Sequence, residues 1–122
     1  QRLDRGKKQQ FDLLVGGWNG DYNDPQTFTE LFLSDSPFNR GKWANAEYDR
    51  LVKKAAYHPN REERTQLQFE AEKILLEDMG VIPLYHEASL AATKPFVKGM
   101  YWNLVGQNYT LKETSIEWNP NQ

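Results

Sequence analysis

The chain has 122 residues and a mass of 14.3 kDa, which suits one domain or a part of one. Its 15 basic and 17 acidic residues give a net charge of −2, which argues against a nucleic-acid binder because such proteins need a basic face. There is no cysteine, so disulfides, thiolate metal sites and thiol nucleophiles are excluded, and 13% aromatic residues argue against general disorder. The chain does not begin with Met and is expected to be a piece of a longer protein, so the lack of a visible signal peptide carries little meaning.

The first 25 residues predict one strand between polar segments. Residues 1–10 are polar and basic, with Leu3 as the one apolar anchor, and are typical of the frayed end of a helix. Residues 11–15 are mostly apolar and stop at Gly16-Gly17, which predicts a buried strand. Residues 18–25 are rich in turn formers and predict a loop.

Three helices are expected after this loop. The first is short and covers residues 26–33, and the second begins at Asn45 and ends at Tyr57. The third begins at Asn60, with Glu63 at the spacing of a capping box, and is expected to stop at Gly80. Each helix has an apolar stripe. In the first helix it is formed by Phe28, Leu31 and Phe32, and in the second by Tyr48, Leu51, Val52, Ala55 and Ala56. In the third helix it is formed by Leu67, Ala71, Ile74, Leu75 and Met79.

The remainder predicts short strands. Residues 81–85 read as a strand that Pro83 places at an edge or a bulge, and residues 90–93 could extend it. Residues 94–122 are rich in Gly and Asn and predict short strands and loops. A buried strand needs neighbours on both sides, so these elements make a poor domain by themselves and favour part of a larger α/β protein.

The densest candidate site is the loop of residues 16–22, directly after the predicted strand, where α/β sheets commonly bind ligands. Its glycines allow another chain to approach the backbone or permit a turn with positive φ. Trp18 could form a pocket wall, Asp21 could face a cation, and Asn19 offers an amide. In the alternative interpretation, Trp18 fills the core and Asp21 forms an Asx turn.

Other chemistries find little support. Residues 21–24 are similar to the start of a calcium loop, but Gln26 and Phe32 stand where an EF-hand needs Gly and Glu. His58 and His86 lack a second ligand at metal spacing, and no nucleophile elbow, phosphate loop or zinc-protease motif is present. Carboxylates beside tryptophans could suit a glycosidase, but nothing fixes a pair at the required separation. We therefore expect no catalytic residue, no metal and no cofactor.

The segment FDLLVGGWNGDYNDPQTF, residues 11–28, resembles a segment of the oligopeptide-binding proteins of peptide ABC transporters, extracellular solute-binding protein family 5. Further segments match the family in the same order, namely residues 45–51, 60–79, 81–85 and 94–99. Each match is weak alone, but the ordered set, which spans about residues 11–100, is specific to the family.

The resemblance implies an α/β fold, the C-terminal part of a two-lobed periplasmic-binding-protein-like (type II) fold that closes by a hinge. Residues 1–88 would belong to the second lobe, and residues 89–122 would cross back toward the first. The protein would be no enzyme. It would bind short peptides in an extended form between its lobes and work with the membrane permease subunits of an importer. It would be extracytoplasmic, in the periplasm or lipid-anchored, and the fragment would self-associate through exposed sheet edges.

The resemblance also implies roles for individual residues. Asp21 matches the acid that pairs with the peptide's α-ammonium group, Gly17 and Asn19 match positions whose backbones bond to the peptide, and Trp18 matches an aromatic that lines side-chain space. Val15 departs from the family, because several members carry Arg there, so the preferred peptide length stays open. The alternatives are a dipeptide, cell-wall peptide or metal chelate as ligand, or a glycosidase-like enzyme.

Overall fold

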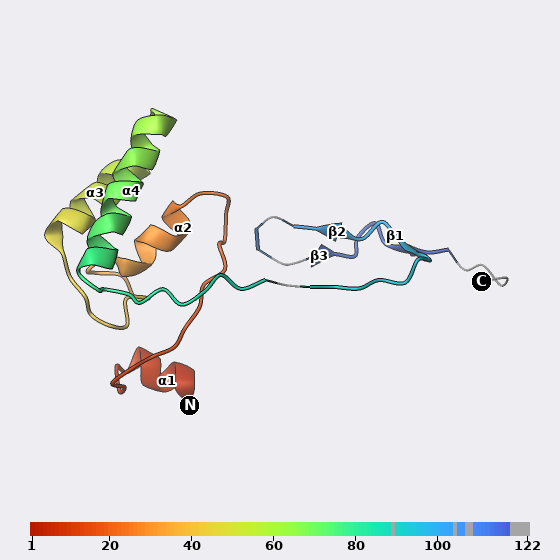
Figure 1. Ribbon diagram of the computed structural model, residues 1–122, viewed down its shortest axis with the longest axis horizontal. Helices are drawn as coiled ribbons and strands as arrows, with labels where there is room; N and C mark the ends of the chain where they lie inside the picture. Colours follow the sequence, from red (N-terminus) through yellow and green to blue (C-terminus); the bar gives the residue numbers. More distant parts are fainter. Residues whose placement is uncertain (89, 104, 107–108, 118–122) are drawn as a thin grey trace.

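The structure, a computed structural model, describes residues 1–88, 90–103, 105–106 and 109–117. Figure 1 shows helices at one end of the molecule and an arm of short strands at the other, joined by the long segment that follows the last helix. In chain order the elements are α1 (Arg2–Lys7), α2 (Gln26–Thr29), the 3-10 turn η1 (Glu30–Phe32), α3 (Ala46–Ala56), α4 (Arg61–Glu77), β1 (Val97–Lys98), β2 (Tyr101–Trp102), β3 (Tyr109–Thr110) and β4 (Ser115–Ile116). No helix of the described residues has the length and apolar character needed to cross a membrane.

The hydrophobic core lies between α3 and α4. It is formed by the apolar stripe predicted for the two helices, and its buried members are Tyr48, Leu51, Val52, Ala71 and Leu75. Burying one large apolar side chain contributes about 1.5–3 kcal/mol, so this stripe is the main stabilising contact of the helices. Two residues expected in the stripes, Phe28 and Met79, are 47% and 70% exposed. Those two assignments are wrong, since α2 buries Thr27 and Thr29 in place of Phe28, and Met79 lies beyond the end of α4.

Asparagine side chains begin both long helices, as predicted. The Oδ1 atom of Asn45 accepts hydrogen bonds from the backbone N–H groups of Glu47 and Tyr48, at 3.0 and 3.1 Å. Asn60 accepts in the same way from Glu62 and Glu63, at 2.9 and 3.1 Å. These bonds satisfy N–H groups that have no partner inside the helix.

The end of α4 differs from the prediction in its details. Met79, with a φ of 54°, takes the left-handed conformation expected for Gly80. Hydrogen bonds from the N–H of Gly80 to the carbonyl of Leu75, 2.9 Å, and from Met79 to Leu76, 3.2 Å, close the helix in a Schellman motif. Gly80 is needed for packing instead, since an added Cβ would lie 2.7 Å from Leu75 Cδ1 and 2.8 Å from Trp43 Cδ2.

Neither predicted strand forms. Residues 11–15 pair with no other described segment, and Leu13 and Val15 are 85% and 65% exposed. Residues 81–85 are likewise irregular, with Ile82, Leu84 and Tyr85 mostly exposed. The physical reason is shared: a strand exists only through hydrogen bonds to a neighbouring strand, and among the described residues neither segment has one.

The arm contains the short strands predicted for the last part of the chain. β1 pairs antiparallel with β4, and β2 pairs antiparallel with β3, where Trp102 lies opposite Tyr109. These two rings meet edge to face with centroids 5.9 Å apart. Residue 89, at which the predicted division between lobes falls, lies outside the described residues.

Candidate functional site

The candidate site is the exposed loop of residues 16–22, which leads from residues 11–15 into α2 (Figure 1). Gly17, Trp18, Asn19 and Asp21, the four residues singled out in the sequence, are all exposed on it. The structure thus places all four predicted site residues at the surface, within residues 17–21 of one loop.

Trp18 lies outside the core. Its side chain meets Phe38 edge to face, with ring centroids 4.9 Å apart and an angle of 66° between the planes, and Trp18 is still 37% exposed. An aromatic pair of this kind contributes about 0.5–1.5 kcal/mol beyond the buried area. The indole therefore packs against Phe38 while part of Trp18 stays accessible to solvent.

The backbone of the loop is open at Gly16, Gly17 and Asn19, whereas the carbonyl of Gly20 accepts a hydrogen bond from the N–H of Gly106 at 3.1 Å. An added Cβ at Gly16 or Gly17 would meet no atom within 4 Å, and the backbone groups of Gly17 and Asn19 form no hydrogen bond with any described residue. Neither glycine has a positive φ. Among the described residues nothing blocks access to the main chain at these two glycines, and neither is needed for a turn with positive φ. At Gly20 the loop turns against α2, since an added Cβ would lie 3.3 Å from Thr27 Cγ2.

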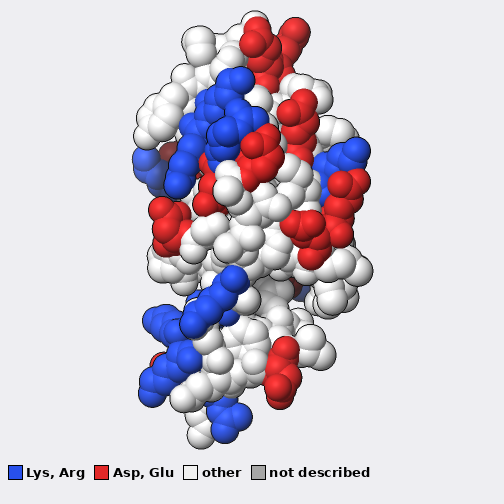
Figure 2. All heavy atoms as spheres, turned by 90° about the vertical axis from the view of Figure 1, so that its left-hand side faces the viewer, with Lys and Arg blue, Asp and Glu red and all other residues white. Residues whose placement is uncertain are grey.

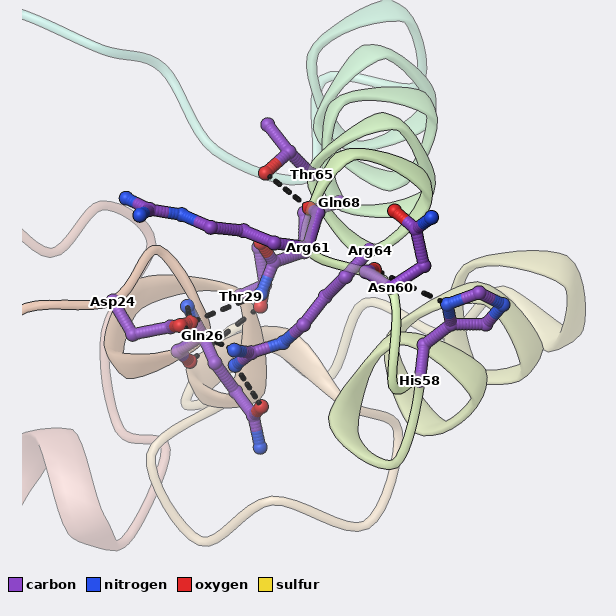
Figure 3. A network of polar contacts seen from close by, with 9 residues as sticks. All are labelled: Asp24, Gln26, Thr29, His58, Asn60, Arg61, Arg64, Thr65 and Gln68. Atoms are coloured by element: carbon purple, nitrogen blue, oxygen red, sulfur yellow. Dashed lines mark hydrogen bonds and ion pairs between the residues drawn. The ribbon is translucent and has the colours of Figure 1, made fainter.

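The two carboxylates of the DYND segment, residues 21–24, have different surroundings. The backbone N–H of Asp21 donates to Thr27 Oγ1 at 3.0 Å, but its exposed carboxylate has no ion pair or hydrogen bond among the described residues. Asp24 is fully engaged: its Oδ2 lies 2.6 Å from Arg64 Nη1, and its Oδ1 accepts from Gln26 N at 2.9 Å and Gln68 Nε2 at 3.1 Å (Figure 3). Asp21 therefore offers an unpaired negative charge, whereas Asp24 ties the loop to α4.

The electrostatics of Asp24 follow from these contacts. Burial raises the pKa of this carboxyl, but the hydrogen bonds from Gln26 and Gln68 and the charge of Arg64 outweigh burial and hold the pKa below its usual value. Asp24 is therefore ionised at neutral pH, with both oxygens in use.

Sequence reasoning missed this network. Asp24 stands directly before Pro25 at the start of α2, which is a helix-start signal that could have identified it as a capping residue. Arg64 and Gln68 are four residues apart on α4 and so share one face of that helix. Nothing in the sequence says that this face meets the loop.

The surface beside the loop is basic. A hollow of about 430 Å³ is lined by Lys7, Phe38 and Arg40 among others, and Phe38 is the ring that Trp18 contacts. Figure 2 shows Lys and Arg side chains gathered at the end of the molecule where Figure 1 places α1. Among the residues that the structure describes, no group of three or more His, Asp or Glu side chains could hold a metal ion.

Known proteins are similar to this chain in both sequence and fold. No protein-family model matches the chain. It is 36% identical over 97 residues to the periplasmic oligopeptide-binding protein OppA of Haemophilus influenzae, covering 80% of this chain and 18% of the relative. It is also 32% identical over 120 residues to a dipeptide-binding protein of Lactococcus lactis, covering 96% of this chain and 22% of the relative.

A solved structure of Listeria monocytogenes OppA bound to peptide matches with a TM-score of 0.82 and 34% identity, over 97% of this chain and 22% of the other. These matches confirm the predicted fold class, the α/β type II class of periplasmic binding proteins. The chain is a homologue of one segment of the oligopeptide- and dipeptide-binding proteins of ABC transporters, the family indicated by its motifs. It spans about a fifth of the length of these relatives.

Proposed function

We propose that this chain supplies a ligand-binding loop to the extracytoplasmic substrate-binding component of an ABC importer, which holds short peptides in an extended form between two lobes. The observation that carries the proposal is the exposed carboxylate of Asp21, which has no ion pair or hydrogen bond with a described residue and lies on a loop whose backbone is open at Gly17 and Asn19. The names of the homologues, oligopeptide- and dipeptide-binding proteins, support the same ligand class.

Each residue of the loop has a part in this proposal. The carboxylate of Asp21 pairs with the α-ammonium group of the peptide and so marks its N-terminus. The backbone groups of Gly17 and Asn19 bond to the peptide main chain, an interaction that gives affinity whatever the peptide's side chains are. The exposed part of Trp18 borders the space for one of those side chains. The protein performs no catalysis.

The proposal extends to location and partners. The protein acts outside the cytoplasm, in the periplasm or lipid-anchored on the outer face of the membrane, and delivers its ligand to the permease subunits. Residues 1–88 and 89–122 belong to different lobes. The separation of the helices from the strand arm in Figure 1 supports this division, and the word periplasmic in a relative's name supports the location.

The test is Asp21→Asn in the complete gene product that contains this sequence, with peptide affinity measured by calorimetry. Removing one partner of a desolvated charge pair typically costs about 2–5 kcal/mol, so affinity should fall by at least about thirtyfold. Asp35→Asn is the matched control, because the side chain of Asp35 is 74% exposed and its one ion pair with a described residue is to Lys53, at 3.7 Å. Equal affinity in the Asp21 variant and the control would refute the role of Asp21.

The ligand class has its own test. A dipeptide, a cell-wall peptide and a metal chelate are the other ligands to distinguish, and a homologue named for dipeptides makes the first of them the main rival. Mass spectrometry of ligands that copurify with the complete gene product separates these classes by mass. Recovery of peptides longer than two residues supports the proposal, and recovery of dipeptides alone rejects it.

We also propose that the 122-residue chain by itself self-associates through the edges of its short sheets. Each sheet has two strands among the described residues, so their outer backbone groups are open to further pairing. Sedimentation at increasing concentration should show growth in mass, and a constant monomer mass would rule this out.

A further inference from the structure

The loop that carries Asp21 is anchored three residues further on by a contact that crosses to α4. The guanidinium of Arg64 lies 2.6 Å from Asp24, and the two side chains are only 26% and 22% exposed. Arg64 also donates from Nη2 to Gln26 Oε1 at 3.1 Å, so its fork bridges the loop and the first residue of α2 (Figure 3). Gln68, one turn further along α4, donates to the same carboxylate at 3.1 Å.

We propose that the Asp24–Arg64 pair is a positioning device for peptide recognition: without touching the peptide, it sets the direction of the Asp21 carboxylate. This inference rests on the proposed function, since it assigns a purpose to the pair only if Asp21 receives the ligand's ammonium group. Asp24 belongs to the loop segment of residues 11–28, but its partner Arg64 lies on α4, so that segment alone does not reveal the contact.

The geometry supports positioning because the segment between the anchors is short. At one end the N–H of Asp21 is bonded to Thr27 Oγ1 at 3.0 Å, and at the other end both oxygens of Asp24 are held. Only Tyr22 and Asn23 lie between these two residues, so the backbone from which the Asp21 side chain projects has little freedom. Binding groups must be held within about 0.5 Å of the productive geometry, and this requirement is met by fixing the backbone that carries them.

Charge supports a second effect of the pair. Two carboxylates three residues apart could both attract an ammonium group, and the peptide could then bind in two positions. Arg64 neutralises Asp24, whose oxygens are all engaged, and Asp21 is left as the one acid of residues 21–24 whose carboxylate is not paired with a described residue. The pair thereby defines where the N-terminus of the peptide is placed.

If Asp24 and Arg64 only stabilised the fold, their variants would give a different result from variants that misplace Asp21. A variant that only weakens the fold lowers the affinity for every peptide equally. A variant that misplaces Asp21 lowers the affinity for a peptide with a free α-ammonium group but not for its N-acetylated form, which carries no charge there. The ratio of the two affinities is thus a measure of positioning that general instability does not change.

The experiment compares tetra-alanine with N-acetyl-tetra-alanine by calorimetry on the complete gene product. Asp24→Asn and Arg64→Met should each reduce the affinity ratio by about tenfold or more, since a misplacement of about 1 Å can cost a hundredfold. Gln68→Met keeps the ion pair and removes one hydrogen bond, so it should reduce the ratio by less. Asn45→Ala is the control: it removes hydrogen bonds to Glu47, Tyr48 and Asp78, which lie in α3 and at the end of α4, so it weakens the helices without removing an anchor of the loop and should leave the ratio unchanged.

The outcomes are distinguishable. If Asp21→Asn leaves the ratio at its original value, the role of Asp21 in the proposed function fails. If Asp21→Asn abolishes the preference but the Asp24 and Arg64 variants retain it, only the positioning role is overturned. Thermal melting identifies any variant that does not fold. If the Asp24 or Arg64 variant fails to fold, Gln68→Met takes its place, and an unchanged affinity ratio in Gln68→Met overturns the positioning role.

Discussion

The phenolic hydroxyl of Tyr48 donates a hydrogen bond of 2.6 Å to the backbone carbonyl oxygen of Thr29, which joins the middle of the helical core to the end of α2. Tyr48 is fully buried, and its ring meets Trp43 edge to face at 4.9 Å. Burial, with smaller effects from Asp49 and Glu72, raises the pKa of the Tyr48 hydroxyl well above its usual value. The group therefore stays protonated and continues to donate throughout the neutral range.

Replacing Tyr48 by Phe tests this bond. The ring keeps its packing, but the carbonyl of Thr29 loses its partner in a buried place, which should cost about 1–3 kcal/mol of the free energy of unfolding in urea. Tyr57→Phe is the matched control, because Tyr57 is 90% exposed and its variant should lie within about 0.5 kcal/mol of the original. Equal stability of the two variants would show that the bond contributes nothing.

The start of α4 depends on one side-chain oxygen. Asn60→Ala removes the acceptor for the N–H groups of Glu62 and Glu63, and it should lower the free energy of unfolding by about 1 kcal/mol. Asn60→Asp restores an acceptor and should recover most of this loss. Circular dichroism during urea unfolding measures both, and failure of Asp to recover stability would argue against capping as the cause.

Gly80 is a packing residue. Gly80→Ala forces a methyl group against Leu75 and Trp43, at 2.7 and 2.8 Å, so overpacking should cost about 1–3 kcal/mol in urea unfolding. Gly41→Ala provides the comparison, since nothing lies within 4 Å of a Cβ at that position. A loss of stability at Gly41 as large as that at Gly80 would contradict the packing explanation.

Acid should weaken the contact between the loop and α4. The folded pKa of Asp24 lies below its ordinary value, so its contribution to stability is present above about pH 4 and is lost as pH falls through the folded pKa. The chain should thus be more stable than its Asp24→Asn variant at neutral pH, and the difference should shrink in acid. Urea midpoints over a pH series measure this, and a difference that stays constant with pH would be inconsistent with ionisation of Asp24.

The helices were predictable because their signals are local. Asn45 and Asn60 begin α3 and α4 through bonds to residues two and three positions ahead, and the apolar stripes recur within each helix. The exposed loop was predictable in the same way, from glycines, an aromatic and an acid in a few consecutive positions.

What could not be predicted depends on partners far away in the sequence. Residues 11–15 have the composition of a strand, but a strand needs neighbours that the described residues do not offer. Asp24 and Arg64 likewise give no sign in the sequence that a loop and a helix meet. Sequence reasoning therefore identified exposed residues of the loop as a candidate site, but it missed the contact that anchors this loop to α4.

The short connection between α3 and α4 has a consequence for the order of folding. Only residues 57–60 separate the two helices that form the core, so closing the chain between them loses little entropy. Structures dominated by contacts between near neighbours fold fastest. The α3–α4 hairpin is thus expected to nucleate first during synthesis, before residues 97–116 of the arm have left the ribosome.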